Sequence, residues 1–433
     1  MQPTRRRPIR YLLGALALLV VVGMVVGLVV VLSNRNKAAP PVAGGPRPSV
    51  PLRPRAGALR ANAVDVLALG ATLTEKTSQT EALPVGLLQT SINFINVSLG
   101  ANGTSSPEPS PGVFDWSSLD ARMAQVAPLA STVTMRVFDA PDWMKPAKGK
   151  DVAVSPQHYQ DFANLVLAAA RRYPQIHYFA IWNEMFGYRA RDSAWSYQAY
   201  TNMYNVVYTT LKSFNASLKV GGPYVPFAPA GGHAHKSTLS GPWGYIDQNA
   251  LDTVTYWLQH KTGADFVAID GRTADPGVTP QQPVAATELF SAVTDWVKQQ
   301  TTLPIWWMEW YARSPDLGQT EWDAISAYAL MQLAASGANA AFLWDPEYIP
   351  NQSITTPGLL VRGTGAGTAL APVFEALRNK LFQSTVTLAS PVAGVVVLRN
   401  TSHYVAVDID GLAHTTTILG AAVPLSPWQI ATG

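Results

Sequence analysis

Short apolar runs alternate with amphipathic stretches along most of this 433-residue chain. The runs have the length and the β-branched and aromatic content of buried strands. They cover residues 64–73, 92–99, 133–138, 177–183, 218–221, 266–269, 305–310 and 340–344. Helical patterns separate them at residues 116–130, 156–173, 197–214, 249–260, 284–298 and 321–336, and another follows at 369–381. Only the first connection, residues 75–89, is a poor helix former. Eight strands alternating with helices predict an α/β fold, a (β/α)8 TIM barrel over residues 61–381.

The pattern changes at both ends of the chain. Residues 382–433 contain β-branched runs separated by turn residues, which predicts a small C-terminal β-rich appendage. Residues 11–32 are uncharged and mostly apolar, long enough to cross about 30 Å of hydrocarbon as a helix. Four arginines lie in the preceding basic tail, residues 1–10, and predict a cytoplasmic N-terminus. We therefore expect a transmembrane signal anchor, followed by a Pro/Ala/Gly-rich linker at residues 33–60.

A cleavable signal peptide is the alternative interpretation of residues 11–32. Its apolar region is usually shorter, about 7–15 residues, and no small-x-small cleavage site closes the run before Asn34. The sequence thus favours a single-pass protein of the plasma membrane with its catalytic domain on the extracellular face, and the lipid bilayer as a partner. Secretion after cleavage stays open.

Composition and charge exclude several function classes. The chain is 48% hydrophobic with 13 Trp, 16 Tyr and 13 Phe, which is enough to fill a large barrel core. The net charge of +3 is misleading, because residues 1–60 hold ten basic residues and no acidic one. The remaining 21 basic and 28 acidic residues give about −7, which argues against nucleic acid as a partner. The absence of cysteine excludes disulfides and thiolate metal sites. No pattern fixes the oligomeric state.

Two of the apolar strand candidates carry a glutamate at or next to their C-terminal end, Glu184 and Glu309. The C-terminal ends of barrel strands meet at one mouth, where active sites of this fold lie. Two carboxyl groups there are what cleavage of a glycosidic bond requires, one as proton donor and one as nucleophile. Strict alternation places Trp307 with Glu309 on one face of its strand, and Trp182 with Glu184, with Asn183 pointing elsewhere.

A structural role is the alternative for both glutamates, as acids paired with Arg189, Arg191 or Arg313. A charged residue that ends an apolar, Trp-rich strand usually serves a site, and the two together favour the functional interpretation.

Several motifs occur in an order that resembles clan A glycoside hydrolases, most closely family 39, the family of β-xylosidases and α-L-iduronidases. The resemblance covers about residues 60–381. The motifs that carry it are Ile-Trp-Asn-Glu at 181–184, Met308-Glu309-Trp310, Val113-Phe-Asp-Trp-Ser-Ser-Leu-Asp120, Ala140-Pro-Asp-Trp-Met144 and Lys219-Val-Gly-Gly-Pro223.

The resemblance implies a role for each matching residue. Glu184 would be the acid/base, Asn183 would bind the sugar 2-hydroxyl, and Glu309 would be the nucleophile of a retaining double displacement. Trp344 ends the eighth strand where related enzymes place an aromatic floor under the sugar, although a role as a core plug is the alternative. Further candidates for substrate contact, for which core packing is equally expected, are Trp143, Tyr188, Trp310 and Tyr311.

One segment departs from the family pattern. Family 39 enzymes usually carry a His and a Tyr after the sixth strand, and the Tyr touches the nucleophile. Here the run reads Phe266-Val-Ala-Ile-Asp270-Gly271-Arg272. Either another tyrosine, such as Tyr311, serves Glu309, or the substrate differs from that of the known members.

The predicted function is therefore a retaining glycoside hydrolase that acts on a carbohydrate, an oligo- or polysaccharide, without a cofactor. Two histidines in a loop, His233 and His235, lack a third ligand nearby and do not predict a metal site. Two alternatives remain: a catalytically silent barrel that binds glycans, and an endo-acting clan A glycanase similar to cellulases or mannanases.

Overall fold

The computed structural model describes residues 67–74, 77, 83–101, 104–130, 132–149, 151–190, 194–230, 235–274, 280–313, 316–350 and 356–433. The predicted anchor at residues 11–32 and the predicted linker at 33–60 lie outside these residues. Within them, no helix combines the length and the apolar composition that crossing a bilayer requires.

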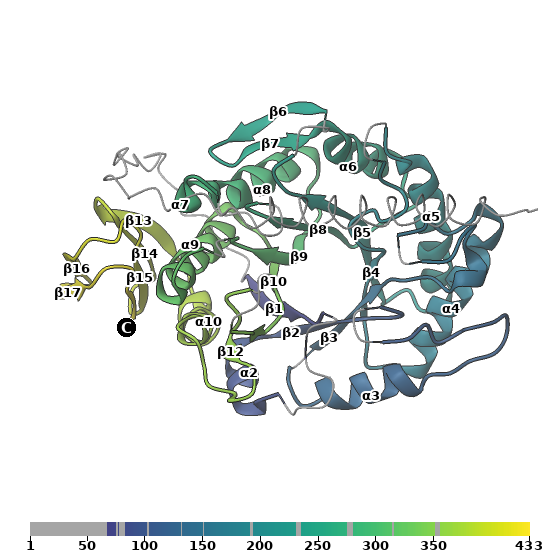
Figure 1. Cartoon of the computed structure of the whole chain (residues 1–433), viewed down its shortest axis with the longest axis horizontal. Helices are drawn as coiled ribbons and strands as arrows, with labels where there is room; N and C mark the ends of the chain where they lie inside the picture. The colour runs from purple at the N-terminus through teal and green to yellow at the C-terminus, as the bar shows by residue number, and fades with distance from the viewer. Residues whose placement is uncertain are drawn as a thin grey trace, which may run out of the picture. The chain divides into compact units, whose positions relative to one another are not determined.

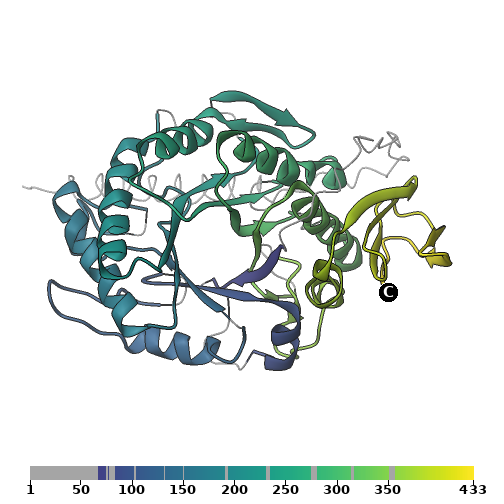
Figure 2. The same ribbon diagram turned by 180° about the vertical axis from the view of Figure 1, so that it is seen from behind.

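Parallel strands form a closed barrel surrounded by helices (Figures 1 and 2). Each strand pairs with the next barrel strand along the chain, and the last pairs with the first to close the ring. The eight strands are β1 (Ala68–Thr72), β2 (Phe94–Ser98), β3 (Thr132–Val137), β4 (Tyr178–Ile181), β5 (Lys219–Phe227), β8 (Phe266–Arg272), β9 (Ile305–Tyr311) and β10 (Ala340–Trp344). The predicted (β/α)8 barrel is confirmed, and the fifth strand is longer than its apolar run indicated.

The helices follow the predicted stretches closely. Those that connect or follow the barrel strands are α2 (Val85–Ser91), α3 (Ser117–Val126), α4 (Tyr159–Arg172), α5 (Tyr197–Phe214), α6 (Gln248–His260), α8 (Glu288–Gln300), α9 (Gln319–Ser336) and α10 (Leu370–Asn379). The shorter elements are η1 (Asp142–Met144), η2 (Pro156–His158), α7 (Pro283–Ala286), η3 (Leu381–Gln383), the hairpin β6 (Lys236–Gly241) and β7 (Gly244–Asp247), and the pair β11 (Glu347–Tyr348) and β12 (Leu360–Val361). The poor first helix is α2, with only seven residues.

Two hydrophobic layers make up the core. The inner layer fills the barrel with side chains from strands all around the ring, including Phe266, Trp306 and Phe342. The rings of Phe266 and Trp306 stack with their centroids 4.4 Å apart. The outer layer packs the other faces of the strands against the helices. The barrel interior is thus a packed core, which leaves the strand C-termini as the place for a site.

Two strands carry an extra residue that breaks the alternation of faces. In β9, Trp307 and Glu309 pair with consecutive residues of β8, so that Met308 is the inserted residue. In β5, Tyr224 is inserted in the same way between two residues that pair with β8, and its φ is +56°. A β-bulge of this kind bends the strand and redirects the side chains around it.

The bulge in β9 sends its side chains to different layers. Trp307 lies in the outer layer, where its indole Nε1 donates to Thr294 Oγ1 at 3.0 Å and its ring meets Phe290 edge-on. Met308 lies in the inner layer, and Glu309 binds a side chain from across the barrel. The expectation that Trp307 and Glu309 share a face was therefore wrong, because strict alternation holds only in an unbulged strand.

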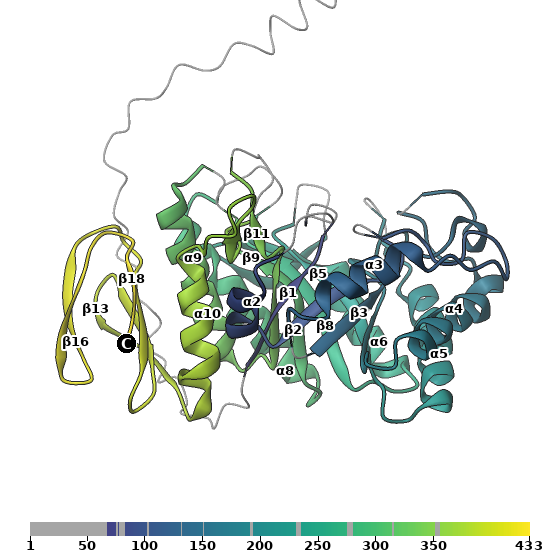
Figure 3. The ribbon, with the colours of Figure 1, turned by 90° about the horizontal axis from the view of Figure 1, so that it is seen from below.

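A C-terminal β-structure follows the barrel. Antiparallel strands β13 (Thr387–Val392), β14 (Val395–Arg399), β15 (Tyr404–Asp408) and β18 (Ile430–Thr432) form one sheet, and β16 (His414–Ile418) and β17 (Ala421–Leu425) form a hairpin. Side chains of β14 and β15 join the hydrophobic layer that includes α9 and α10. Figure 3 shows this C-terminal sheet beside the two helices. The Asn400 Nδ2 also donates to Lys380 O at 3.0 Å, which ties the sheet to the end of α10.

Trp307 should be a stability residue and not a site residue. We expect Trp307→Ala to lower the free energy of unfolding by about 3–5 kcal/mol, because it empties a large buried volume. Trp307→Phe, which keeps a ring but loses the bond to Thr294, should cost less. Urea denaturation of both variants measures this. A loss below about 1 kcal/mol for Trp307→Ala would contradict the outward position of the indole.

Candidate active site

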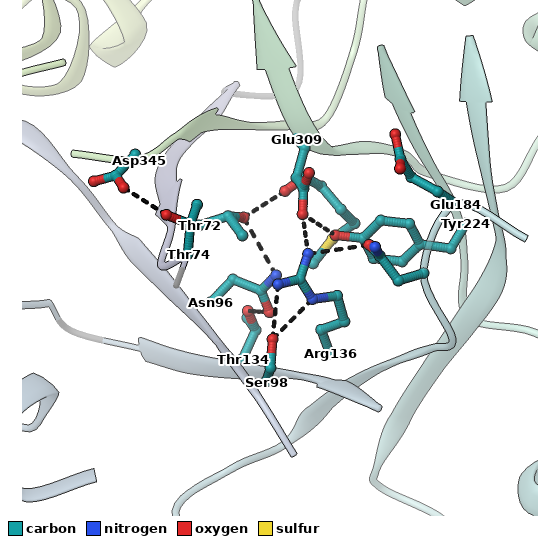
Figure 4. Close-up of polar contacts among 12 residues, drawn as sticks. Thr72, Thr74, Asn96, Ser98, Thr134, Arg136, Glu184, Tyr224, Glu309 and Asp345 are labelled. Carbon is teal, nitrogen blue, oxygen red and sulfur yellow. Dashed lines mark hydrogen bonds and ion pairs between the residues drawn. The ribbon is translucent and has the colours of Figure 1, made fainter. Parts of the chain in front are cut away.

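Arg136 is the centre of a polar network at the barrel mouth (Figure 4). It belongs to β3, and its side chain is 1% exposed. Its Nη1 donates to Glu309 Oε1 and, at 3.0 Å, to Asn183 Oδ1. Its Nε and Nη2 donate to Ser98 Oγ on β2 at 2.9 and 2.7 Å. The Arg136 guanidinium thus binds two of the predicted site residues, Asn183 after β4 and Glu309 on β9.

The charge state of this pair follows from its surroundings. Burial is the largest single effect on the pKa of Arg136 and lowers it, but the charge of Glu309 together with the contributions of Tyr224 and Asp270 leaves that pKa raised. The guanidinium is therefore fully charged, and it compensates the buried Glu309 carboxylate, whose side chain is 9% exposed.

Tyr224 supplies a second donor to the same carboxylate. Its Oη donates to Glu309 Oε1 at 3.3 Å, and the bulge in β5 turns its side chain into the inner layer. Burial and the charge of Glu309 raise the pKa of Tyr224 well above its usual value, so the phenol keeps its proton. Another tyrosine, such as Tyr311, was one of two explanations for the departure after the sixth strand, and the tyrosine that binds Glu309 is Tyr224.

A chain of hydroxyl and amide groups supports the bulge beneath Glu309. Thr72 Oγ1 on β1 donates to Met308 O at 2.5 Å, and it accepts from Asn96 Nδ2 on β2 at 3.3 Å. Thr134 Oγ1 on β3 donates to Asn96 Oδ1 at 2.9 Å. These contacts satisfy polar groups inside the barrel and fix the backbone that presents the carboxylate.

Glu184 lies beyond the end of β4, in a turn with unusual backbone angles. Trp182, Glu184 and Met185 have φ values of +79°, +42° and +55°, which non-glycine residues rarely adopt. Trp182 packs into the outer layer against Phe138, so it does not share a face with Glu184 as alternation suggested. Backbone strain of this type is common at functional sites.

Two arginines surround the Glu184 carboxylate. Arg272 Nη1 lies 3.1 Å from Oε1, and Arg189 Nη2 lies 3.8 Å from Oε2. Arg189 was one of the three partners named for a structural acid, whereas Arg272 was not. Arg191 lies outside the described residues, and the guanidinium of Arg313 sits over the Tyr311 ring at 5.6 Å. The Glu184 side chain is 17% exposed, more than that of Glu309.

Tyr311 and Trp344 form an aromatic pair at the ends of β9 and β10. Their rings stack with centroids 4.9 Å apart and an interplanar angle of 30°. Burial raises the pKa of Tyr311 to about 12, and Glu184 and Glu309 are close enough to contribute to that rise. The structure therefore brings these two aromatic residues to the glutamates.

The other predicted contact residues make contacts of their own. Tyr188 is buried between Trp182 and Tyr200, and Trp310 is buried against Phe290 of α8. Both belong to the outer hydrophobic layer and are not brought to the glutamates. Trp143, in η1, is half-buried, and its indole Nε1 donates to Glu108 O at 2.9 Å.

Asp270 is a third carboxyl group at this mouth that sequence reasoning did not assign. It lies on β8, pairs in register with Glu309, and is 2% exposed. The only trace of it in the sequence is that it ends an apolar strand, as Glu309 nearly does.

Comparison with known proteins places the fold among glycoside hydrolases. No protein-family model and no curated protein sequence matches the chain. A β-xylosidase from Caulobacter crescentus CB15 matches with a TM-score of 0.56 and 17% identity, over 81% of this chain and 75% of its own. A family 39 glycoside hydrolase from Bacteroides cellulosilyticus WH2 matches at 0.57 and 14%, over 85% and 79%. A GH30 endoxylanase from Clostridium papyrosolvens C71 matches at 0.54 and 12%, over 86% and 97%.

These matches confirm the predicted resemblance to clan A and family 39 at the level of the fold. At identities of 17% or less they show a shared architecture.

The Arg136–Glu309 pair should behave as one energetic unit. Arg136→Met leaves a carboxylate buried without its cation, and we expect a loss of about 3–5 kcal/mol in the free energy of unfolding. The double variant Arg136→Met/Glu309→Gln should recover most of that loss, because the uncompensated charge is gone. Urea denaturation of the two single variants and the double variant completes the cycle.

The pH dependence gives an independent check on this cycle. The loss in Arg136→Met should be smaller at pH 4 than at pH 8, because protonation of Glu309 removes the uncompensated charge. Equal losses at both pH values, or no recovery in the double variant, would show that the two side chains are not coupled.

Proposed function

We propose that this protein is a retaining glycoside hydrolase in which Glu309 is the nucleophile and Glu184 is the acid/base. The observation that carries the proposal is the environment of Glu309, a buried carboxylate on the seventh barrel strand that accepts from both Arg136 and Tyr224. Family 39 and GH30 enzymes share the fold, which supports the assignment of the reaction class.

In the first step, an oxygen of Glu309 attacks the anomeric carbon, and the bond from that carbon to the leaving oxygen breaks. Glu184 gives its proton to the leaving oxygen, and a covalent glycosyl ester on Glu309 results. In the second step, Glu184 removes a proton from water, the water oxygen bonds to the anomeric carbon, and Glu309 leaves as a carboxylate. The donors Arg136 and Tyr224 orient this carboxylate and stabilise its charge when it leaves.

Asn183 is suited to bind the sugar 2-hydroxyl. A guanidinium only donates hydrogen bonds, so the amide atom that faces Arg136 is the acceptor Oδ1. The amide NH2 group of Asn183 is therefore held as a donor, next to the nucleophile. The Tyr311 and Trp344 pair supplies an apolar surface for the C–H face of a sugar ring.

Arg272 has a specific place in this proposal. It contacts the Oε1 atom of Glu184. The glycosidic oxygen would have to approach this carboxyl group to receive its proton. The leaving oxygen of the substrate would take over that contact, and Arg272 would shift towards substrate hydroxyls. Glu184, more exposed than Glu309, lies on the side from which a leaving group departs to solvent.

The location of the enzyme is proposed from its sequence. The apolar run at residues 11–32, with four arginines before it, supports a single-pass anchor with the barrel on the extracellular face. The Pro-rich residues 33–60 would then separate the barrel from the bilayer. An extracellular carbohydrate is the substrate class that fits this arrangement.

The proposed roles predict different losses in two variants. Hydrolysis of a panel of aryl glycosides and polysaccharides should be abolished in Glu309→Gln with every leaving group. Glu184→Gln should lose about 10²–10⁴-fold with poor leaving groups and least with activated aryl groups, which need no proton. Glu375→Gln, a change on the exposed side of α10, is the matched control and should retain activity.

The stereochemistry of the product tests the double displacement itself. Proton NMR of the first product should show the same anomeric configuration as the substrate. An inverted product would exclude Glu309 as a nucleophile. Glycan binding without turnover, unchanged in both variants, would instead favour a silent glycan-binding barrel.

A further inference from the structure

Asp270 lies at the C-terminal end of β8, close enough to both proposed catalytic glutamates to feel their charges. Along β8, Phe266 and Ala268 belong to the inner layer, and Val267 and Ile269 belong to the outer layer. Asp270 continues the inner series at the C-terminal end of the strand. It pairs with Glu309 on one side and with Pro226 of β5 on the other.

The carboxyl group of Asp270 has no hydrogen-bond partner among the described residues. Both of its oxygens are buried, and neither accepts or donates a bond. Leaving a buried polar group unpaired is costly, and folded proteins rarely do so without a reason. Asn183 and Ser98, by contrast, are both bonded to Arg136. Asp270 therefore has two unbonded carboxyl oxygens at the barrel mouth, where a ligand could bond them.

Charged and titratable groups face Asp270 from several neighbouring elements. They are Glu309 on β9, Glu184 and Arg189 after β4, Arg272 on β8, Arg136 on β3 and Tyr224 on β5. Burial and the charges of Glu184 and Glu309 raise the pKa of Asp270 well above its usual value, and Arg272 and Arg189 oppose that rise only in part. This environment favours the protonated form, a carboxylic acid with one O–H donor and one carbonyl acceptor.

We propose that Asp270 is a sugar-binding residue whose carboxyl group binds a single hydroxyl of the sugar in the cleaved subsite. A hydroxyl is itself one donor and an acceptor, so it satisfies both oxygens of an acid at once. The inference rests on the proposed function and specifies its substrate class. The substrate is a glycoside with a free hydroxyl at the ring position that faces β8, because a hydroxyl both donates and accepts and so matches the two oxygens of the acid.

This assignment gives a reason for the departure from the family pattern after the sixth strand. Family 39 enzymes usually have a His and a Tyr in this region, and this chain has Asp270, Gly271 and Arg272. The contact with the nucleophile is made from β5 by Tyr224. The position on β8 is thereby released from supporting Glu309 and is available to select the substrate.

The experiment compares Asp270→Leu with Asp270→Asn in the full-length protein, on the glycoside that the wild type hydrolyses best and on its monodeoxy analogues. Leu has a similar size and no hydrogen-bonding group, and we expect it to raise KM about tenfold with a smaller change in kcat. Asn keeps a donor and an acceptor and should recover most of that affinity. On the one analogue that lacks the bound hydroxyl, the wild type and Asp270→Leu should have equal KM values.

The pH profile of kcat/KM tests whether the acid is neutral at the working pH. An ionised Asp270 would raise the proton affinity of the nearby glutamates, so its removal would move both limbs of the profile to lower pH. A neutral Asp270 exerts no such effect, and the profile of Asp270→Asn should keep the wild-type position. A shift to lower pH by about one unit would overturn the proposed state of the group.

Other outcomes also contradict the proposal. A KM in Asp270→Leu equal to that of the wild type on every substrate would make Asp270 a structural residue. A loss of kcat in Asp270→Asn that grows with poorer leaving groups would make it a proton donor. Thermal melting of each variant, with Glu375→Gln as control, separates these effects from unfolding.

Failure of the proposed function is distinguishable from failure of this inference. If the wild type hydrolyses no glycoside, the same comparison is made on the Kd of a monosaccharide measured by calorimetry. A weaker Kd in Asp270→Leu that Asp270→Asn restores would then support the binding role without catalysis. Equal Kd values, or no sugar binding by the wild type, would overturn it.

Discussion

The buried ion pair between Arg136 and Glu309 is the interaction on which the barrel mouth depends. A carboxylate inside a barrel needs a compensating charge, and the guanidinium that provides it needs acceptors of its own. A guanidinium is planar, with donors in fixed directions, so Ser98, Asn183 and Glu309 must occupy matching positions around it. One side chain on β3 thereby couples β2, the turn after β4, and β9.

This coupling requires side chains that an unbroken strand could not supply. In regular alternation, consecutive residues point to opposite faces, yet Met308 and Glu309 both serve the barrel interior. The bulge in β9 makes this possible, and Thr72 binds the carbonyl of the inserted residue. The bulge at Tyr224 does the same for β5. The positive φ of Tyr224 costs conformational free energy. The same strained residue donates the hydrogen bond to Glu309, so the strain lies at the proposed site.

The sequence predicted the scaffold well and the site in part, for a physical reason. Strand and helix periods are local, because one core selects apolar residues along each element, and all eight barrel strands were found in this way. Glu184 and Glu309 were found because each follows an apolar run. Arg136 was not, since one charge in a strand of mixed residues resembles a solvent-facing position, and its partner Glu309 lies 173 residues away. For the aromatic residues, the sequence did not distinguish core packing from contact with a substrate.

The same reasoning explains why bulges escaped prediction. A bulge does not change the composition of a strand. It changes only the pairing with its neighbours, which are about 40 residues away for β8 and β9. Alternation fails at Tyr224 and at Glu309. These two residues bind each other, and Glu309 also binds Arg136. Such local conflicts between pattern and structure are expected where a protein is built for a ligand and not only for stability.

The charges at the barrel mouth set Asp270 apart from the two glutamates. Glu309 is bonded to Arg136, and Glu184 is paired with Arg272, so both carboxylates already have guanidinium partners. Asp270 lies beside them without a hydrogen bond among the described residues. Stability alone would favour an apolar residue at that position, since a buried acid with no partner weakens the fold. Its presence is understandable if a polyhydroxylated ligand supplies the missing bonds.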